Sequence, residues 1–331
     1  MHHLVTGTAG FIGFHLALRL LAEGHEVTGV DGVTPYYDVS LKQSRLDILN
    51  RRPGFREERA MLEDMSALER IWSARPVDTV VHLAAQAGVR YSLENPRAYI
   101  DANLVGTFNV MEMVRMHPAR HFMLASTSSA YGANTRMPFA ETERADHQIT
   151  LYAATKKATE AMAHCYSHLW RIPTTAFRFF TVYGAWGRPD MAHFKFTRGI
   201  LAGEPIDIYN NGAMERDFTY IDDLVEAIVR LAACVPGDKP AAGDSLSPAA
   251  PFRVVNIGPG APSSLMDFVA EIERAAGREA IRNYLPMQAG DVARTFANAD
   301  LLHALTGYRP STPISVGIPA FVAWYRQYYG V

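Results

Sequence analysis

The sequence predicts an α/β protein in which a doubly wound parallel sheet is joined to a smaller mixed α/β domain. Over the first 180 residues, short apolar runs alternate with longer amphipathic ones, which is the pattern of repeated strand–helix units. The run VDTVVHL at 77–83 is almost continuously apolar, as suits a parallel strand covered on both faces. A glycine-rich turn at 6–13 stands between the first expected strand and the first expected helix.

Each element follows from its own pattern. Apolar positions in 11–22 recur at helical spacing, and Gly24 can end that helix because glycine adopts positive φ. Two serines at the start of 263–276 can cap a helix there. The other expected helices cover 99–114, 151–169, 191–202 and 223–233, and the expected strands cover 3–6, 26–30, 77–83, 121–126, 174–180 and 254–257. The Gly- and Pro-rich stretches 183–190 and 236–251 are expected to be loops, the second of them exposed.

Composition excludes several classes of protein. With 331 residues, of which 48% are hydrophobic and 20% charged, the chain can build a sizeable core, which excludes wholesale disorder. A formal net charge of −2 gives no support to a nucleic-acid partner. The two cysteines form no CxxC motif or Cys/His cluster, so we expect neither a disulfide scaffold nor a metal site.

The location of the protein is also an expectation from the sequence. No uninterrupted apolar run approaches 18 residues, so we expect no membrane partner. The glycine-rich turn begins at Gly7, which leaves no room for a signal peptide. We therefore expect a cytoplasmic protein.

The glycine-rich turn predicts a dinucleotide site. Gly7 permits the tight turn, Gly10 lets backbone approach a pyrophosphate, and Gly13 lets the helix pack close to the sheet. The helix N-terminus offers free N–H groups and a partial positive charge to the phosphates. Asp31 ends the second strand, where a carboxylate accepts hydrogen bonds from ribose hydroxyls. Residues 32–34 supply no Arg or Lys for a 2′-phosphate, which favours NAD over NADP.

A second group of residues predicts proton transfer. Tyr152 and Lys156 are four residues apart on an expected helix and therefore share one face. An ammonium group near the phenol, together with the positive ring of oxidised NAD, would favour the phenolate. Lys157 is one residue off this face and is expected to be a solvated charge. The hydroxyl-rich segment 126–129 ends a strand at the edge where open α/β sheets bind ligands, so a hydroxyl there can bridge substrate and tyrosine.

With these motifs placed, the chain resembles the nucleotide-sugar epimerases and dehydratases of the extended short-chain dehydrogenase/reductase family, which share a Rossmann domain. The resemblance covers nearly the whole length. It rests on TGTAGFIG (6–13), Asp31, HLAAQAGVR (82–90), Asn103 with Gly106 and Thr107, STSSAYG (126–132), YAATK (152–156), RDFTYIDD (216–223), GDV (290–292) and FVAWYRQYY (321–329). Within the family the 4-epimerases of UDP-glucuronate are most similar, through YYDVSLK (36–42), AAQAGVRYSLENP (84–96), LYAATKKA (151–158) and RFFTVYGAWGRPDMA (178–192).

The resemblance implies a role for each matched residue. Thr127, Tyr152 and Lys156 would be catalytic. NAD would be held by Gly7, Gly10, Phe11, Ile12, Gly13, Asp31, Asp64, Met65, Leu83, Ala84, Ala85, Tyr152 and Lys156, with Asp64 and Met65 beside the adenine. The UDP-sugar would be held by Arg90, Ser128, Ser129, Thr181, Arg188, Arg216 and Asp291. Among these, Arg90 and Arg216 would meet the pyrophosphate, Thr181 and Arg188 the sugar carboxylate, and Asp291 the uridine ribose.

The resemblance also implies the reaction. In this family Tyr152 would take the proton of the 4-hydroxyl while hydride moves from C4 to NAD, which gives a 4-keto sugar. Related dehydratases carry an Asp-Glu pair after the catalytic Thr, and related decarboxylases carry a Glu two residues after it. Here Ser128 and Ser129 stand at these positions, and serine is a poor general base. The implied outcome is reversible C4 epimerisation of UDP-glucuronate to UDP-galacturonate, with Thr181 where galactose-type 4-epimerases usually carry Asn.

Three alternatives remain open at this point. They are a neutral UDP-hexose 4-epimerase, a UDP-glucuronate decarboxylase, and a non-catalytic NAD-sensing regulator on the same fold. We expect residues 1–180, with returning segments at about 217–258, to bind NAD, and 181–216 with 259–331 to bind the nucleotide sugar. Family habit suggests a homodimer through the helices at 99–114 and 151–169, whose apolar faces could instead be wholly intramolecular.

Overall fold

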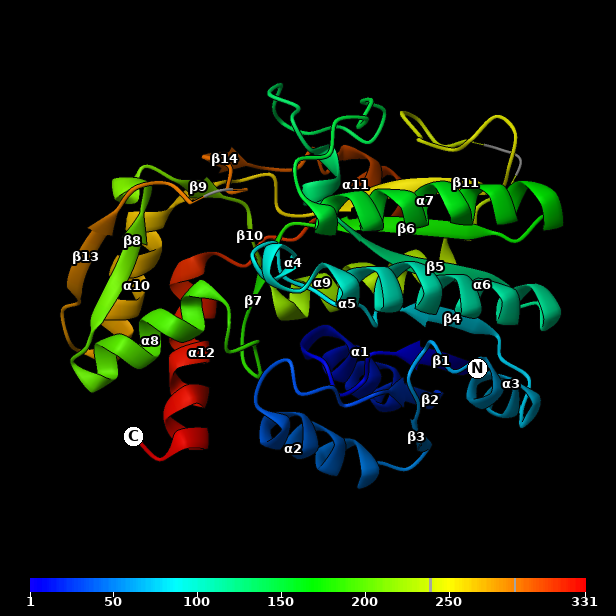
Figure 1. The fold of residues 1–331 in the computed structure, drawn as a ribbon, viewed down its shortest axis with the longest axis horizontal. Helices are drawn as coiled ribbons and strands as arrows, with labels where there is room; N and C mark the ends of the chain where they lie inside the picture. Colours follow the sequence, from blue (N-terminus) through cyan, green and yellow to red (C-terminus); the bar gives the residue numbers. More distant parts are fainter. Residues whose placement is uncertain (238–239, 289) are drawn as a thin grey trace.

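The centre of the protein is a seven-stranded parallel sheet in the order β11-β6-β5-β4-β1-β2-β3. The structure is a computed structural model that describes residues 1–237, 240–288 and 290–331. In Figure 1 the sheet lies in the larger part of the molecule, and further strands are added on both sides of β1. This topology, with β1 and β4 adjacent at the reversal of strand order, is that of the predicted doubly wound fold.

The bounds of the elements are as follows. The strands are β1 His2–Thr6, β2 Glu26–Asp31, β3 Phe55–Arg59, β4 Thr79–His82, β5 His121–Thr127, β6 Thr174–Phe179, β7 Thr181–Tyr183, β8 Pro205–Tyr209, β9 Glu215–Arg216, β10 Phe218–Tyr220, β11 Phe252–Ile257, β12 Ser263–Ser264, β13 Ile281–Leu285 and β14 Arg294–Thr295. The helices are α1 Phe11–Ala22, α2 Val39–Asn50, α3 Met65–Ser73, α4 Tyr91–Glu94, α5 Pro96–Tyr99, α6 Gly106–Met116, α7 Leu151–Trp170, α8 Ala192–Ala202, α9 Ile221–Ala233, α10 Leu265–Ala276, α11 Asp300–Thr306 and α12 Ile314–Tyr329, with a π-helical stretch η1 Ile100–Val105 and short 3₁₀ turns η2 Ser128–Tyr131 and η3 Asn210–Gly212.

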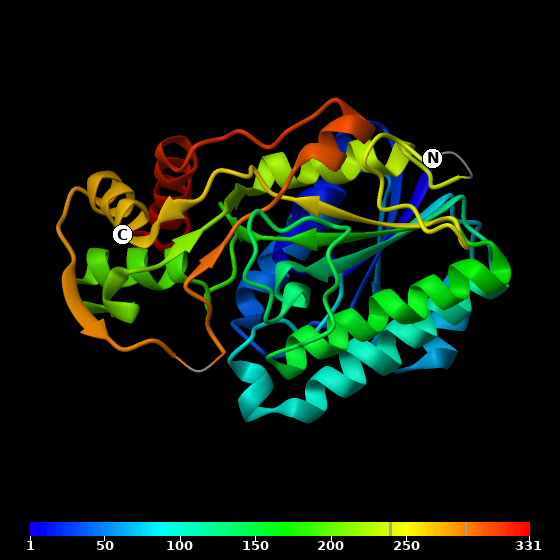
Figure 2. The same cartoon turned by 90° about the horizontal axis from the view of Figure 1, so that it is seen from above.

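Helices cover both faces of the central sheet. One face is packed by α1, α9 and α11, with α2 against α1, and the other by α3, α6 and α7 (Figures 1 and 2). Apolar side chains form a separate core on each side, for example Phe14 and Leu224 on the first and Leu68 and Val110 on the second. Continuous burial of β1, β4 and β5 follows from this double cover, as their apolar runs predicted.

The smaller part of the protein has its own apolar core. It contains α8, α10, α12 and the parallel pair β8–β13, and Phe268 stacks on Phe218 at its centre, with ring centroids 4.0 Å apart. Figure 1 shows this part beside the carboxyl end of the central sheet. A pocket is lined by residues from the loops after β1, β2, β3, β4 and β7 and from the end of β5, together with α7, so these segments form the candidate site.

Several expectations about local structure need correction. The expected single helix at 99–114 is divided by η1, which lies between α5 and α6. The loop at 236–251 is not fully exposed: Asp244 is buried and ion-paired with Arg253 of β11 at 3.0 Å. Residues 238–239 of this loop, and Ala289 before the GDV stretch, lie outside the described residues. In the described parts of the chain, no helix combines the length and apolarity needed to cross a bilayer.

Candidate functional site

The glycine-rich turn is fixed by backbone geometry. Gly7 has φ +83°, and its N–H donates to the carbonyl of Val30 at 2.7 Å, which holds the turn against β2. A Cβ on Gly13 would stand 2.1 Å from the Gly7 carbonyl oxygen, and one on Gly7 would stand 2.9 Å from the backbone nitrogen of Ala84. Larger residues are therefore excluded where α1 begins, and the helix N-terminus lies beside the open turn.

Asp31 lies at the carboxyl end of β2 and lines the same pocket as Gly7, Gly10 and Gly13. Its carboxylate accepts the backbone N–H of Ala9 at 2.9 Å and that of Val33 at 2.7 Å. These bonds fix the acid beside the phosphate turn and leave lone pairs for ribose hydroxyls.

Lys42 is a pocket residue that the sequence reasoning missed. It is 6% exposed, and its ammonium donates to the carbonyl of Thr34 at 2.7 Å and lies 4.5 Å from the centre of the Tyr37 ring. Burial lowers its pKa, and the negative charge of Asp31 partly opposes this. Its place in the motif YYDVSLK was the available signal, but a lysine eleven residues after Asp31 cannot be placed beside it from spacing alone.

One continuous pocket connects the glycine turn with the predicted proton-transfer residues. Its wall includes residues to which the sequence analysis gave a role at the site, namely Phe11, Ile12, Leu83, Ala84, Ala85, Thr127, Tyr152, Lys156 and Arg188. It also includes Tyr36, Lys42, Met61, Leu62 and Glu63. Asp64 and Met65 are not part of it. Asp64 is the N-cap of α3, and its carboxylate accepts the N–H of Ala67 at 3.0 Å. Residues 61–63, directly before them, line the pocket, and the expected place of Asp64 and Met65 beside the adenine stays a prediction.

Tyr152 and Lys156 lie one turn apart on α7, whose N-cap is Thr150. Burial raises the pKa of the Tyr152 phenol, and the Thr127 hydroxyl and the Arg188 charge partly oppose this. Burial lowers the pKa of Lys156 to about 8, partly opposed by Glu160. Thr127 and Arg188 thus favour the phenolate against the effect of burial, and the expected contributions of Lys156 and oxidised NAD stay predictions.

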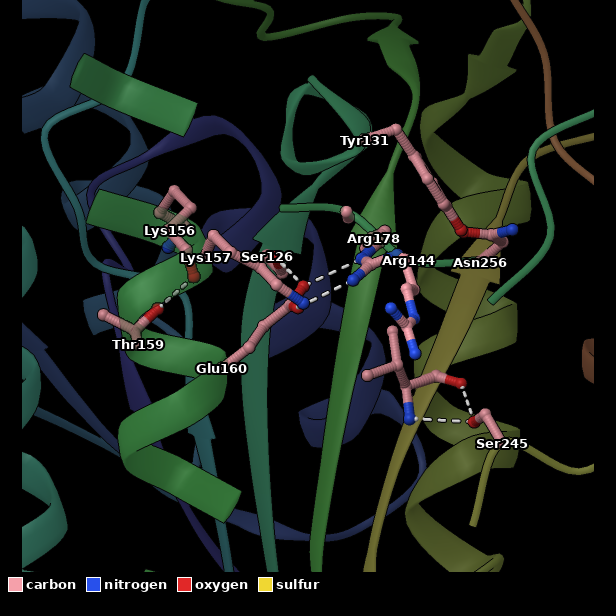
Figure 3. A network of polar contacts seen from close by, with 12 residues as sticks. Ser126, Tyr131, Arg144, Lys156, Lys157, Thr159, Glu160, Arg178, Ser245 and Asn256 are labelled. Carbon is pink, nitrogen blue, oxygen red and sulfur yellow. Dashed lines mark hydrogen bonds and ion pairs between the residues drawn. The ribbon is translucent and has the colours of Figure 1, made fainter. Parts of the chain in front are cut away.

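Glu160 organises a charged network behind these residues, which Figure 3 shows. It is four residues beyond Lys156 on α7, is 2% exposed, and accepts two hydrogen bonds from Arg178 of β6 at 2.8 and 2.7 Å. Its carboxylate also accepts a hydrogen bond from the Ser126 hydroxyl of β5 at 2.6 Å and one from the Lys157 ammonium at 3.0 Å. Lys157 is thus ion-paired and only a third exposed, which corrects its interpretation as a solvated charge.

The hydroxyl segment is only partly in the pocket. Thr127 lines it, and its Oγ1 accepts the N–H of Ser129 at 3.2 Å, which starts the turn η2. Ser128 and Ser129 are half-buried in that turn, outside the pocket wall. Thr181 begins β7, next to the wall residues Phe180 and Val182, but is itself outside the wall.

Arg188 reaches the pocket from the loop after β7. Its Nε and Nη2 donate to the two carboxylate oxygens of Asp190, at 3.0 and 2.5 Å. The Tyr36 hydroxyl donates to Asp190 at 3.1 Å. Sequence reasoning missed both Asp190 and Tyr36, since an Arg-Pro-Asp sequence does not tell whether its two charges meet.

The residues expected at the diphosphate and uridine lie together and are not among the residues of the pocket wall. Arg90 pairs with Asp291 at 3.0 Å, and its guanidinium lies 4.8 Å from the centre of the Tyr209 ring. Arg216 donates to the carbonyls of Glu215 and Ala293, and burial together with the nearby Arg90 charge lowers its pKa. The fold thus brings together two cations and an acid from segments more than 70 residues apart.

These features define a class: a dinucleotide-binding Rossmann protein whose pocket brings Thr127, Tyr152 and Lys156 together. Comparison with known proteins refines it. The sequence matches the NAD dependent epimerase/dehydratase family over residues 3–244, and the chain belongs to that family. It is 60% identical to a probable UDP-glucuronate 4-epimerase of Rhizobium meliloti (strain 1021), over 99% of this chain and 98% of the relative. It is 44% identical to UDP-glucuronate 4-epimerase 2 of Arabidopsis thaliana, over 98% of this chain and 76% of the relative.

Solved structures agree with the sequence relatives. The crystal structure of a UDP-glucuronic acid 4-epimerase from Bacillus cereus, in complex with UDP-glucuronic acid and NAD, matches with a TM-score of 0.89 at 30% identity, over 99% of this chain and 100% of that one. A UDP-glucose 4-epimerase from Thermotoga maritima with UDP-glucose matches with a TM-score of 0.87 at 27% identity, over 99% and 100% of the two chains.

Proposed function

We infer that the protein is an NAD-dependent isomerase that interconverts UDP-glucuronate and UDP-galacturonate by inverting C4. The observation that carries this inference is that Arg188 lines the same pocket as Thr127, Tyr152 and Lys156. A site that places a guanidinium beside a proton-transfer set suits a sugar that bears a carboxylate. The proteins from Rhizobium meliloti, Arabidopsis thaliana and Bacillus cereus named above are called 4-epimerases of UDP-glucuronate or UDP-glucuronic acid, whereas the one from Thermotoga maritima is called a UDP-glucose 4-epimerase.

The residues of the pocket fit NAD. The open turn after β1 has no Cβ at Gly7, Gly10 or Gly13 and offers the N-terminus of α1 to a pyrophosphate. The Asp31 carboxylate is held beside that turn and suits a ribose diol. Phe11 and Ile12 begin α1, Leu83, Ala84 and Ala85 follow β4, and all five line the pocket. NAD held by these residues would supply a reversible acceptor for the hydride of C4.

We propose that Tyr152 is the base that accepts the proton of the 4-hydroxyl and later returns it. Its phenol is buried, so a charged phenolate needs compensation, which the nearby Thr127 hydroxyl and Arg188 charge supply. Lys156 is 3% exposed, and its ammonium is available to a ribose hydroxyl of the cofactor. No net redox change results, because the C4–H bond that breaks is re-formed on the other face of the same carbon.

The same residues explain why the proposed outcome is epimerisation. A 4-keto uronate is a β-keto acid and loses CO₂ when its carboxylate bond aligns with the carbonyl π system. Holding the carboxylate away from that alignment suppresses the loss, and we assign this to Arg188, with Thr181 as a further donor. Ser128 and Ser129 supply no carboxylate for a second proton transfer, so a decarboxylase or dehydratase lacks its extra acid/base group.

We propose that Arg90, Arg216 and Asp291 bind the UDP part, with the arginines at the diphosphate and Asp291 at the ribose. In support, the three side chains approach one another and Tyr209 lies beneath Arg90, where it can stack on a base. Residues 1–180 with 217–258 would then bind NAD, and 181–216 with 259–331 the nucleotide sugar. Release of Asp291 from Arg90 would accompany substrate binding.

We also propose a homodimer in the cytoplasm, where NAD and UDP-sugars are available and the product can enter polysaccharide synthesis. The support for the dimer is an apolar surface across η1, α6 and α7: Val105 and Phe108 are 41% and 43% exposed, and Cys165 is exposed on the adjacent helix. Sedimentation of the protein and of Phe108→Asp tests it. A monomeric wild-type protein would contradict the proposal.

Proton NMR of UDP-glucuronate incubated with the purified protein tests the function. A mixture of UDP-glucuronate and UDP-galacturonate is expected, without added cofactor if NAD is resident. A pentose product would instead show a decarboxylase. No change, persisting after NAD is added, would contradict the proposal, and UDP-glucose would then be tested for a neutral 4-epimerase.

A further inference from the structure

The guanidinium of Arg188 has two edges that can each bind a carboxylate, and Asp190 occupies one of them. The Nε/Nη2 edge donates to the two oxygens of Asp190. Among the described residues, none accepts a hydrogen bond from Nη1. A substrate carboxylate can therefore meet only the other edge, formed by Nη1 and the remaining hydrogen of Nη2.

Asp190 is itself held in place. The Tyr36 hydroxyl, from the segment after β2, donates to its Oδ2 at 3.1 Å. Although burial alone would raise the pKa of Asp190, the pairing with Arg188 and the bond from Tyr36 bring it below its ordinary value. The carboxylate is therefore charged at neutral pH, and the ion pair is present before substrate arrives.

The backbone that carries Arg188 is fixed separately. Arg45 of α2 is fully buried and donates through Nη2 to the carbonyls of Trp186 and Gly187, at 2.7 and 3.1 Å. Trp186 has φ +58°, a conformation that a non-glycine residue adopts only when its surroundings impose it. With the backbone anchored by Arg45, the direction of the Arg188 side chain depends on Asp190.

We propose that Asp190 is a positioning residue that turns the Nη1 edge of Arg188 toward the sugar carboxylate, so that Asp190 and Tyr36 determine how well the 4-keto uronate is protected from losing CO₂. This inference rests on the proposed function. The Asp190 charge also offsets that of Arg188, so the pair contributes orientation more than net attraction. The Arg188–Asp190 pair therefore affects which product forms more than it affects the affinity for the substrate.

The test compares Asp190→Asn, Tyr36→Phe and the control Asp300→Asn with the wild-type protein. Asp300 pairs with Arg309 at 2.6 Å on the surface, so the control removes an Arg–Asp pair away from the pocket. Each protein is incubated with UDP-glucuronate; kcat, KM and the pentose fraction are measured by NMR, with NAD content and melting temperature as checks of folding.

For Asp190→Asn we expect kcat to fall about tenfold, KM not to rise because the site gains one positive charge, and the pentose fraction to increase at least several-fold. Tyr36→Phe should change the product in the same direction by a smaller factor, and it supplies the answer if Asp190→Asn does not fold. Asp300→Asn should match the wild type.

Wild-type product ratios in Tyr36→Phe and in any folded Asp190→Asn would overturn the inference, as would a rise in KM with no pentose. A merely structural role of Asp190 would lower NAD content and kcat together and leave the pentose fraction unchanged. Failure of the wild-type protein to convert UDP-glucuronate is a separate result, which would overturn the proposed function itself.

Discussion

Glu160 and Arg178 form a two-point ion pair that is almost completely buried behind the strand carrying Thr127. Both side chains are at most 3% exposed, and the pair joins α7 to β6 while Ser126 adds β5 through its hydroxyl. The pairing lowers the pKa of Glu160 to about 2 although burial opposes this, so the acid remains charged. Helix α7 and strands β5 and β6 therefore share one charged carboxylate.

Glu160→Gln is expected to destabilise the protein by ~3 kcal/mol or more, because it leaves the buried Arg178 charge without its partner. Urea unfolding measures the loss. Glu226→Gln is a matched control, since Glu226 pairs with Arg19 and Arg230 at a partly exposed site and such pairs contribute about 0–1 kcal/mol. Equal, small losses in the two variants would contradict the assignment.

Tyr152→Phe should remove the base while keeping the ring in its buried position. We expect kcat to fall by about 10²–10⁴-fold, the usual contribution of general acid–base catalysis, with the NAD content unchanged. Turnover by NMR and cofactor content by absorbance after denaturation measure the two quantities. Activity close to that of the wild type would exclude Tyr152 as the base.

Arg188→Ala should release more CO₂ than the wild type, because the carboxylate of the 4-keto sugar would no longer be held. The fraction of pentose among the products, followed by NMR, is expected to rise severalfold while overall turnover falls. Thr181→Val is the companion variant, with a smaller expected effect because it removes one neutral donor. An unchanged product ratio for Arg188→Ala would contradict the role of the guanidinium.

The pKa of Lys156 gives a pH dependence for NAD binding. With a pKa of about 8 in the free protein, the ammonium is mostly charged at pH 7 and mostly neutral at pH 9. Because the charged form is expected to bind the ribose and attract the phosphates, affinity for NAD should fall by about tenfold as pH rises through 8. Titration by intrinsic fluorescence tests this, and Lys156→Met should bind weakly with a flat profile. A flat profile in the wild type would contradict the role.

Asp31→Ala should weaken NAD binding by about tenfold, since it removes the acceptor of the ribose hydroxyls. It should also narrow the preference for NAD over NADP, because the carboxylate repels a 2′-phosphate. Binding of both cofactors to the stripped protein measures the two effects. If Asp31→Ala kept or increased the preference for NAD over NADP, Lys42 and the pocket wall at residues 61–63 would determine that preference instead.

Much of the fold was predictable because its signals are local. The helix at 11–22 agrees at both ends with α1, and Gly24 has the positive φ that was expected of it. The π-helical stretch η1 was not predicted, because the sequence analysis treated its residues as part of one continuous helix over 99–114. Strand β13 was missed because four of its five residues are exposed, so it shows no buried face.

The site residues also fall into those that local sequence spacing could predict and those that it could not. The glycine turn and the Tyr152–Lys156 pair could be placed from spacing, since their partners are close in sequence. The place of Asp64 beside the adenine stays a prediction, because an acid at the start of a helix gives the same sequence signal whether it caps the helix or faces a ligand. Asp190 and Lys42 were missed because their roles depend on contacts with Tyr36 and Thr34 that only the folded chain brings about.

Arg45 has a consequence for any attempt to exchange sugar preference between family members. Besides Trp186 and Gly187, it donates to the carbonyl of Ala9 in the glycine turn, at 2.7 Å. If the 184–190 segment were transplanted alone, its backbone would be anchored only if its carbonyls accepted the same two hydrogen bonds from the arginine at position 45. We therefore expect an exchange of sugar preference to succeed when residues 36–45 are transferred together with residues 184–190. The two segments are about 140 residues apart in the sequence but would have to be exchanged as one unit.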